Sequence, residues 1–127
     1  MSKHAPLIVR IDDALGTEEA LTLDPARLAP ASPMPEQYAR NLFSDPGGRF
    51  HTGIWRSGQG AWRVDYTENE FCVLTRGRVR LSDDHGHSWT FEPGEAFLIP
   101  AGFAGLWESI ESVQKFYAIY EPAPSAP

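Results

Sequence analysis

The chain has 127 residues and a formal net charge of −6 at pH 7. This length predicts one domain that buries roughly two-thirds of its unfolded surface, and the acidic balance without a Lys/Arg cluster excludes nucleic acid and anionic membranes as expected partners. The single cysteine, Cys72, has no partner for an internal disulfide, and the first thirty residues show neither a signal peptide nor a membrane span, so we expect a cytoplasmic protein.

The N-terminal third differs in pattern from the rest of the chain. The apolar run Leu7 to Ile11 predicts a strand, residues 17–23 a short helical segment, and residues 25–35, with four prolines, an extended connector. We therefore divide the chain into an N-terminal arm and Pro-rich connector over residues 1–45, a barrel over residues 46–121 and a disordered tail over residues 122–127.

From Phe50 onward, short apolar runs alternate with turn signals every eight to twelve residues. Arg76-Gly77 suits a tight reversal between two strands, because glycine accepts a positive φ. Residues 82–86 predict a second turn, and Glu92-Pro93-Gly94-Glu95 has proline and glycine in the order of a type II turn. The absence of a helical period indicates an all-β sandwich or barrel.

Two spacings in this region carry more information than the strands themselves. Glu70 is followed after six residues by Gly77, and Gly94 is followed after five residues by Pro100 and then by Gly102. In this order they resemble the two motifs of the cupin superfamily. The flanking runs, residues 60–71 and 103–108, are most similar to the (S)-ureidoglycine aminohydrolase-like and ethanolamine-utilisation branch. The resemblance implies an all-β double-stranded β-helix, that is, a cupin-type jelly-roll barrel, with an N-terminal arm.

The same resemblance bears on metal binding. Cupins that hold a metal do so with three histidines and a glutamate, and of these only the glutamate is present here, as Glu70. The histidine positions correspond to Val64 and Tyr66 or to Arg63 and Asp65, and then to Gly105. Since imidazole and carboxylate ligands are what such a metal requires, we favour a metal-free protein, with a divalent metal such as manganese as the alternative.

Acidic and phenolic side chains are the remaining candidates for chemistry. Glu68 and Glu70 are two residues apart, so in an extended segment both face the same side together with Tyr66. Inside an apolar barrel such a group could exchange protons with a substrate, which makes Glu70 and Tyr66 the candidate catalytic residues. The alternative leaves Glu68 in a solvated loop and Glu70 alone inside.

Aromatic residues are abundant near the two motifs and suit the apolar walls of a ligand pocket. Lys115 alternates with Tyr117 on the last strand, where it either pairs with Glu70 or faces solvent. The candidate substrate-binding residues are Trp62, Glu68, Trp107 and Lys115.

These observations favour a domain that binds a small polar metabolite, with an amine or ureido group whose N–H bonds pair with Glu68 and Glu70. Whether it is an enzyme stays open. One alternative is a metal-dependent hydrolase or isomerase of the ureidoglycine aminohydrolase type, which the resemblance implies. Another is a non-catalytic sensor or a structural module. A homodimer is expected, formed through a sheet edge or by exchange of the segment Leu7 to Ile11.

Overall fold

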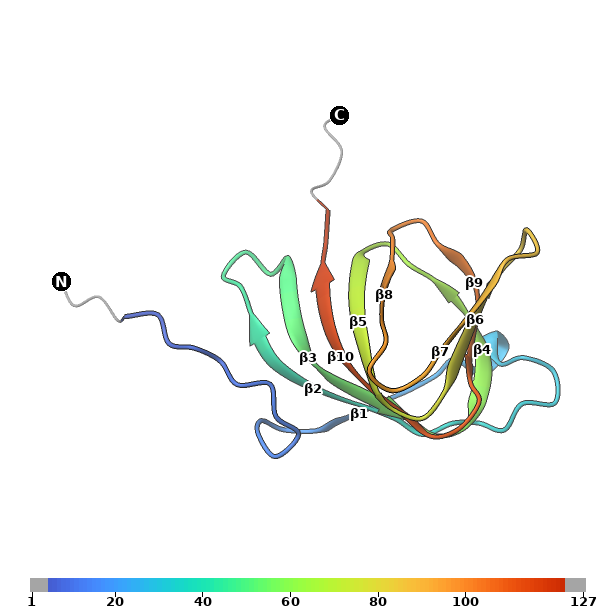
Figure 1. Ribbon diagram of the computed structural model, residues 1–127, viewed down its shortest axis with the longest axis horizontal. Coiled ribbons are helices and arrows are strands. Elements are labelled where there is room, and N and C mark those ends of the chain that lie inside the picture. The colour runs from blue at the N-terminus through green and yellow to red at the C-terminus, as the bar shows by residue number, and fades with distance from the viewer. Residues whose placement is uncertain (1–4, 123–127) are drawn as a thin grey trace.

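The computed structural model describes residues 5–122 and consists of ten strands and one short 3-10 helix (Figure 1). None of the described residues belongs to a helix long and apolar enough to span a bilayer. The elements are β1 (Glu19–Leu21), η1 (Pro25–Arg27), β2 (Gln37–Ser44), β3 (Phe50–Ser57), β4 (Gly60–Asp65), β5 (Asn69–Arg76), β6 (Val79–Asp83), β7 (Ser88–Phe91), β8 (Ala96–Ile99), β9 (Ala104–Ser109) and β10 (Val113–Tyr120).

The strands form two antiparallel sheets that face each other (Figure 1). The larger sheet has the order β1-β2-β3-β10-β5-β8, and the smaller one β4-β9-β6-β7. The chain crosses between the sheets at several points, which is the connectivity of a jelly roll. The prediction of an all-β cupin-type barrel is therefore confirmed.

The turn at Arg76-Gly77 differs from the expected hairpin. Gly77 has the predicted positive φ of 83°, but β5 pairs with β10 and β8, whereas β6 pairs with β9 and β7. The turn thus carries the chain from one sheet to the other. The other two turns are as expected: β6 and β7 form a hairpin, and Gly94 has a φ of 91° in the turn where Glu95 N–H donates to Glu92 C=O.

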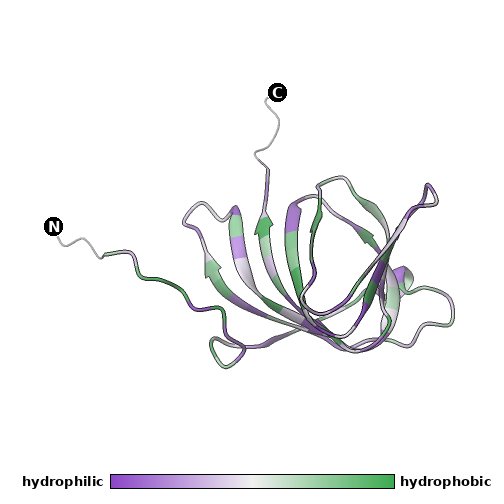
Figure 2. Cartoon of the chain, viewed as in Figure 1, coloured by the Kyte–Doolittle hydropathy of each residue, from purple (hydrophilic) through white to green (hydrophobic). Residues whose placement is uncertain are grey.

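The core lies between the two sheets, where inward-facing residues of both alternate with outward-facing ones. Figure 2 shows the apolar residues along these strands. Trp107 on β9 is 1% exposed and contacts strands of both sheets. The other buried members of the cluster are Trp62, Cys72, Leu74, Val79, Leu81, Ile99 and Val113.

The N-terminal third departs most from expectation. Leu7 to Ile11 is not a strand, and residues 17–23 contain strand β1 instead of a helical segment. Strand β2, within the residues assigned to the arm and connector, pairs with β3 and extends the larger sheet. Pro35 is the last proline of the connector, and Gln37–Ser44 contain none. The backbone N–H groups of this segment can therefore join a sheet ladder. Of the predicted tail, residues 123–127 lie outside the described part of the chain.

Replacing Gly77 by alanine is expected to destabilise the fold strongly. A Cβ atom there would collide with the carbonyl of Ser112, in addition to the strain of the positive φ. Gly86 is the matched control, because its φ is 87° but a Cβ would meet nothing within 4 Å. Denaturant unfolding should show a loss of about 1 kcal/mol for Gly86→Ala and at least about 3 kcal/mol for Gly77→Ala. Equal losses would show that crowding at Gly77 is unimportant.

Candidate ligand-binding site

A cavity of about 310 Å³ opens between the two sheets, next to β1 and β2. Its volume is at the lower end of the range for small-molecule sites, which runs from roughly 300 to 1,000 Å³. The rings of Trp55, Trp62 and Trp107 form its apolar wall, and polar side chains enter from the larger sheet and, for Tyr66, from the segment between β4 and β5. These polar groups are Gln37, Asn41, His51, Tyr66, Glu70, Lys115 and Tyr117.

The most distinctive feature of the wall is a buried ion pair between Glu70 on β5 and Lys115 on β10. Lys115 Nζ lies 2.5 Å from Glu70 Oε2, and the two residues are 4% and 7% exposed. In the register of the sheet, Lys115 stands opposite Leu74 and not opposite Glu70. The lysine side chain therefore runs along the inner face of β5, past Cys72, to reach the carboxylate.

The hydrogen bonds of this pair leave one carboxylate oxygen free. Glu70 Oε2 accepts from Lys115 Nζ and from Cys72 Sγ, which is 3.2 Å away, whereas Oε1 accepts from no group that the structure describes. Among the described residues, no buried side-chain nitrogen or oxygen lacks a partner. Oε1 is consequently accessible from the cavity, where it can accept a hydrogen bond from a ligand.

Two tryptophan rings hold the ammonium group from its other side. Lys115 Nζ lies 4.4 Å from the ring centroid of Trp107 and 4.8 Å from that of Trp55, within the range of cation–π attraction. The two rings meet edge to face, with their centroids 5.4 Å apart. Lys115 is thus fixed between a carboxylate and two aromatic faces.

These surroundings keep Lys115, Tyr66 and Cys72 protonated near neutral pH. Burial by itself would lower the pKa of Lys115, but the electrostatic interactions with Cys72, Glu70 and Tyr66 and the hydrogen bond to Glu70 outweigh it, so the pKa is raised. Burial raises the pKa of the Tyr66 phenol, which therefore keeps its proton. The pKa of Cys72 is raised to about 12, mainly by burial, so the thiol stays neutral.

The structure brings together five of the six residues proposed from the sequence. Trp62, Tyr66, Glu70, Trp107 and Lys115 all line the cavity. The observed ion pair matches one of the two arrangements considered for Lys115.

Glu68 does not line this cavity, which matches the alternative that leaves Glu68 in a loop and Glu70 alone inside. It lies in the bend before β5, not in an extended strand, and lines an open hollow beside the cavity together with Tyr66 and Glu70. Burial, and then the charges of Glu121 and Glu70, raise the pKa of Glu68. Glu68 therefore belongs to the approach to the cavity.

Two polar residues of the wall escaped the sequence analysis because they lie on β2. Gln37 Oε1 accepts from Trp55 Nε1 at 3.3 Å, and Asn41 Oδ1 accepts from the Tyr117 hydroxyl at 2.9 Å. Their signal was the period of two in Gln37, Ala39 and Asn41, all of which line the cavity. The prolines at residues 25–35 led us to assign this segment to the connector, so the alternation was not interpreted as a strand.

The donor groups around the cavity do not fit a divalent metal. Among the described residues, no three His, Cys, Asp or Glu side chains cluster so as to hold an ion. Glu70 already binds the ammonium of Lys115, and both ring nitrogens of His51 are engaged, Nδ1 with Ser44 Oγ at 2.7 Å and Nε2 with Gly48 O at 3.0 Å. A Cβ atom at Gly105 would collide with the carbonyl of Ser82 on β6, so this backbone leaves no room for a side chain there.

Removing the lysine charge should destabilise the protein, because Glu70 would be left buried without its counter-ion. We expect Lys115→Met to lower the free energy of unfolding by about 3–5 kcal/mol, and the added change Glu70→Gln to restore part of the loss. Arg80→Met, which breaks the exposed ion pair with Glu108, should cost less than about 1 kcal/mol. Urea unfolding of the four proteins measures this, and a loss for Lys115→Met no greater than for Arg80→Met would contradict it.

Stability should also fall at alkaline pH. Above pH 9 the Cys72 thiol of the unfolded protein releases its proton, whereas the folded protein holds that proton up to about pH 12. The free energy of unfolding therefore decreases as the pH rises above 9. Below pH 9 both states hold the proton, and the thiol has no effect on stability. The thiol accounts for about 2 kcal/mol by about pH 10.5. In urea titrations Cys72→Ala should lose less stability than the wild type between about pH 8.5 and 10.5. Tyr66 and Tyr117, whose pKa values are also raised, account for the remainder. Parallel curves would refute the assignment to Cys72.

Solved structures with the same fold include proteins of several kinds. A DUF861 family protein of unknown function from Pseudomonas syringae pv. tomato is 30% identical, with a TM-score of 0.74 over 84% of this chain and 46% of that one, so this chain spans about half its length. The EutQ protein of Clostridium difficile is 18% identical, with a TM-score of 0.63 over 80% of this chain and 81% of that one. The Cnp3 cupin domain of Schizosaccharomyces pombe is 12% identical, with a TM-score of 0.58 over 68% of this chain and 65% of that one.

At identities below 25%, the last two likenesses show the fold alone. A comparison with curated proteins finds no match. The model of the EutQ-like cupin domain matches residues 44–117, which include β3 to β9 and both cupin motifs. This chain therefore belongs to the EutQ-like cupin family.

Proposed function

We propose that the cavity binds a small, neutral, polar metabolite that carries an amide or ureido group. The observation that supports this is the ion pair in the cavity wall, with Glu70 Oε1 open to the cavity and Lys115 holding N–H groups that are not used by Glu70. A carboxylate oxygen accepts a hydrogen bond from the ligand's N–H, and an ammonium group donates to its C=O. An amide or urea presents these two groups side by side.

The charge of the site favours a neutral ligand over a free amine. The sequence suggested two carboxylates facing one ligand, an arrangement that attracts a cation. Lys115 compensates Glu70, and Glu68 lies outside the cavity wall, so the wall holds no unpaired carboxylate for an ammonium ligand. Removing a charged amine from water requires more free energy than its contacts with an already neutralised ion pair would supply.

Tyr66 and the tryptophans supply the rest of the recognition. Because the raised pKa of Tyr66 keeps its hydroxyl protonated, the group serves as a hydrogen-bond donor in the cavity. The faces of Trp55 and Trp62, whose ring centroids are 6.2 Å apart, suit a planar ligand group.

We propose binding without catalysis as the activity. A general acid or base works best when its pKa lies near the operating pH, whereas the raised pKa values of Lys115 and Tyr66 hold both protons in place. Val64 and Tyr66 line the cavity, and we take these, not Arg63 and Asp65, as the positions that carry histidine in metal-binding cupins. A sensor or carrier module fits this site better than a metal-dependent hydrolase.

Ligand binding can be followed through the three tryptophans of the wall. Titration with alkylureas, carboxamides, primary amines and carboxylates of matched size should quench or shift the fluorescence with the ureas and amides, and these should raise the melting temperature. Tyr66→Phe should weaken binding about 3- to 10-fold through the loss of one hydrogen bond, while Tyr120→Phe, outside the cavity, should leave it unchanged.

Two results would overturn the proposal. Tighter binding of amines than of ureas and amides would show that the wall acts as an anionic site. Lack of binding by every class, in a protein that melts cooperatively, would show that the cavity has no ligand of this chemistry. Glu70→Gln adds a test of the acceptor: it should reduce affinity more than Tyr66→Phe does, because an ionised acceptor forms the stronger hydrogen bond.

A further inference from the structure

A second cavity lies at the seam between β7 and β8. The two strands are joined by the turn at residues 92–95, yet β7 is the last strand of the smaller sheet and β8 the last strand of the larger one. In Figure 1 they diverge from this turn, with β7 running beside β6 and β8 beside β5. Among the described residues no backbone ladder joins β7 to β8, so only side chains close the seam.

These side chains leave a cavity of about 210 Å³, which we call the seam cavity. All eight residues that line it are apolar, and four of them are aromatic. None of the eight belongs to the wall of the cavity that contains the ion pair. The seam cavity is therefore a separate candidate site of different chemistry.

The floor and the apex of the seam cavity are closed. Leu81 on β6 and Ile99 on β8 are each 3% exposed and belong to the core cluster, so they form the floor. At the apex, beside the turn, the rings of Phe91 and Phe97 stack with their centroids 4.1 Å apart and their planes inclined by 9°. The cavity is thus a wedge that narrows toward two stacked rings.

The rim of the seam cavity is apolar and meets water. Trp89 and Phe91 are two residues apart on β7, so both side chains stand on the inner side of the strand. A closed seam would cover a tryptophan in this position, whereas Trp89 is 44% exposed. Phe103 meets the Trp89 ring edge to face, with the centroids 6.3 Å apart, and Leu98 on β8 completes the rim.

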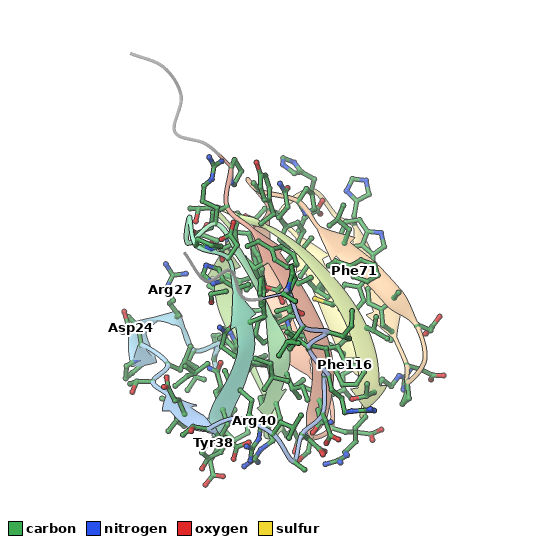
Figure 3. All side chains as sticks on the ribbon, turned by 90° about the vertical axis from the view of Figure 1, so that its left-hand side faces the viewer. Asp24, Arg27, Tyr38, Arg40, Phe71 and Phe116 are labelled. Carbon is green, nitrogen blue, oxygen red and sulfur yellow. The ribbon has the colours of Figure 1, made fainter. Side chains whose placement is uncertain are left out.

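The outer face of the larger sheet is a different surface. Leu98 stands opposite Phe71 in the register of the sheet, and Figure 3 shows Phe71 on that sheet. Phe97 and Ile99, the neighbours of Leu98 along β8, face the opposite way, into the barrel. The seam cavity is therefore part of the barrel interior, and Leu98 marks the edge where the interior meets the outer face.

We propose that the seam cavity binds a small neutral aromatic molecule that consists of one ring and a short polar substituent. An apolar cavity of about 150 Å³ lined by leucine, isoleucine and phenylalanine holds benzene, so the larger seam cavity has room for a substituted ring. A charged group inside would lose its hydration without gaining a counter-ion. The ring enters between Trp89 and Leu98, and its polar substituent stays in water at the rim.

The aromatic lining favours a ring over an aliphatic group of the same size. Aromatic rings attract one another in edge-to-face and offset stacked arrangements, beyond the effect of buried area alone. A ring in the wedge meets Phe91 and Phe97 at the apex. At the rim it meets Trp89 and Phe103. Its flat shape also suits a space bounded by two diverging strands.

The two cavities are separated by one layer of aromatic rings, so a test must distinguish them. The ring centroid of Phe97 lies 6.5 Å from that of Trp107, and the centroid of Phe103 lies 6.4 Å from that of Tyr66. In each pair the first residue lines the seam cavity and the second lines the cavity with the ion pair. Methyl groups lie in both walls, which makes methyl NMR of the full-length protein the suitable measurement.

Benzyl alcohol is the probe. We expect saturable shifts of the methyl signals of Leu81, Leu98 and Ile99, with a Kd of about 1 mM or lower. The signals of Val64 and Ile119, in the wall of the other cavity, should stay in place. Cyclohexylmethanol should bind about 3-fold more weakly, because it lacks the aromatic contacts. Benzoate and benzylamine should bind at least about 10-fold more weakly, because they carry a charge.

A variant at the rim tests the wall itself. Trp89→Ala should weaken the binding of benzyl alcohol at least about 5-fold. Phe43→Ala, at a residue 38% exposed and outside both cavities, is the matched control and should leave the affinity unchanged. Circular dichroism melts show whether the variants are folded. If Trp89→Ala unfolds, Leu98→Ala replaces it, with an expected loss of about 3-fold.

Four results would overturn the proposal. One is the absence of saturable shifts up to about 20 mM benzyl alcohol. Another is a set of shifts confined to Val64 and Ile119, which would place the ring in the cavity with the ion pair. Equal affinities for benzoate and benzyl alcohol would show that the ring does not enter an uncharged wall. Unchanged affinity in a folded rim variant would show that the ring binds elsewhere.

Discussion

The ion pair between Glu70 and Lys115 is the constraint on which the site depends. It joins the neighbouring strands β5 and β10 on their inner face. Cys72 donates a hydrogen bond to the carboxylate, and the rings of Trp55 and Trp107 lie against the ammonium group. A buried pair of this kind adds little net stability compared with an apolar core, but it fixes its members tightly. The cavity wall therefore presents one acceptor and one donor in a defined arrangement.

Much of the fold could be predicted from the sequence because turns and strands are local features. Gly77, Gly86 and Gly94 mark turns whose positive φ only glycine adopts easily, and the apolar runs that follow Phe50 form strands as expected. The pairing of strands is a long-range property, which is why Arg76-Gly77 looked like a hairpin and is a crossing between sheets. The short strand β1 has three residues, too few for a periodic pattern to distinguish it from a helical turn.

The site was predictable to the extent that it lies on the two cupin motifs. Glu70 and Trp107 come from those motifs and face the cavity as expected. The position of Lys115 required the register of β10 against β5, which depends on a bulge between Gln114 and Lys115 that no local pattern signals. For Glu68 the alternation of Glu68 and Glu70 left two arrangements open, and the loop arrangement is the observed one because the strand begins at Asn69.

The closely packed glycine on β9 has a consequence for engineering. Because the Ser82 carbonyl occupies the space beside Gly105, an imidazole cannot be introduced there without moving β6. Val64, which pairs with Gly105 and points into the cavity, offers the open route for a designer who wishes to build a metalloprotein from this barrel. Such a redesign would begin on β4 and would have to remove the lysine that now neutralises Glu70.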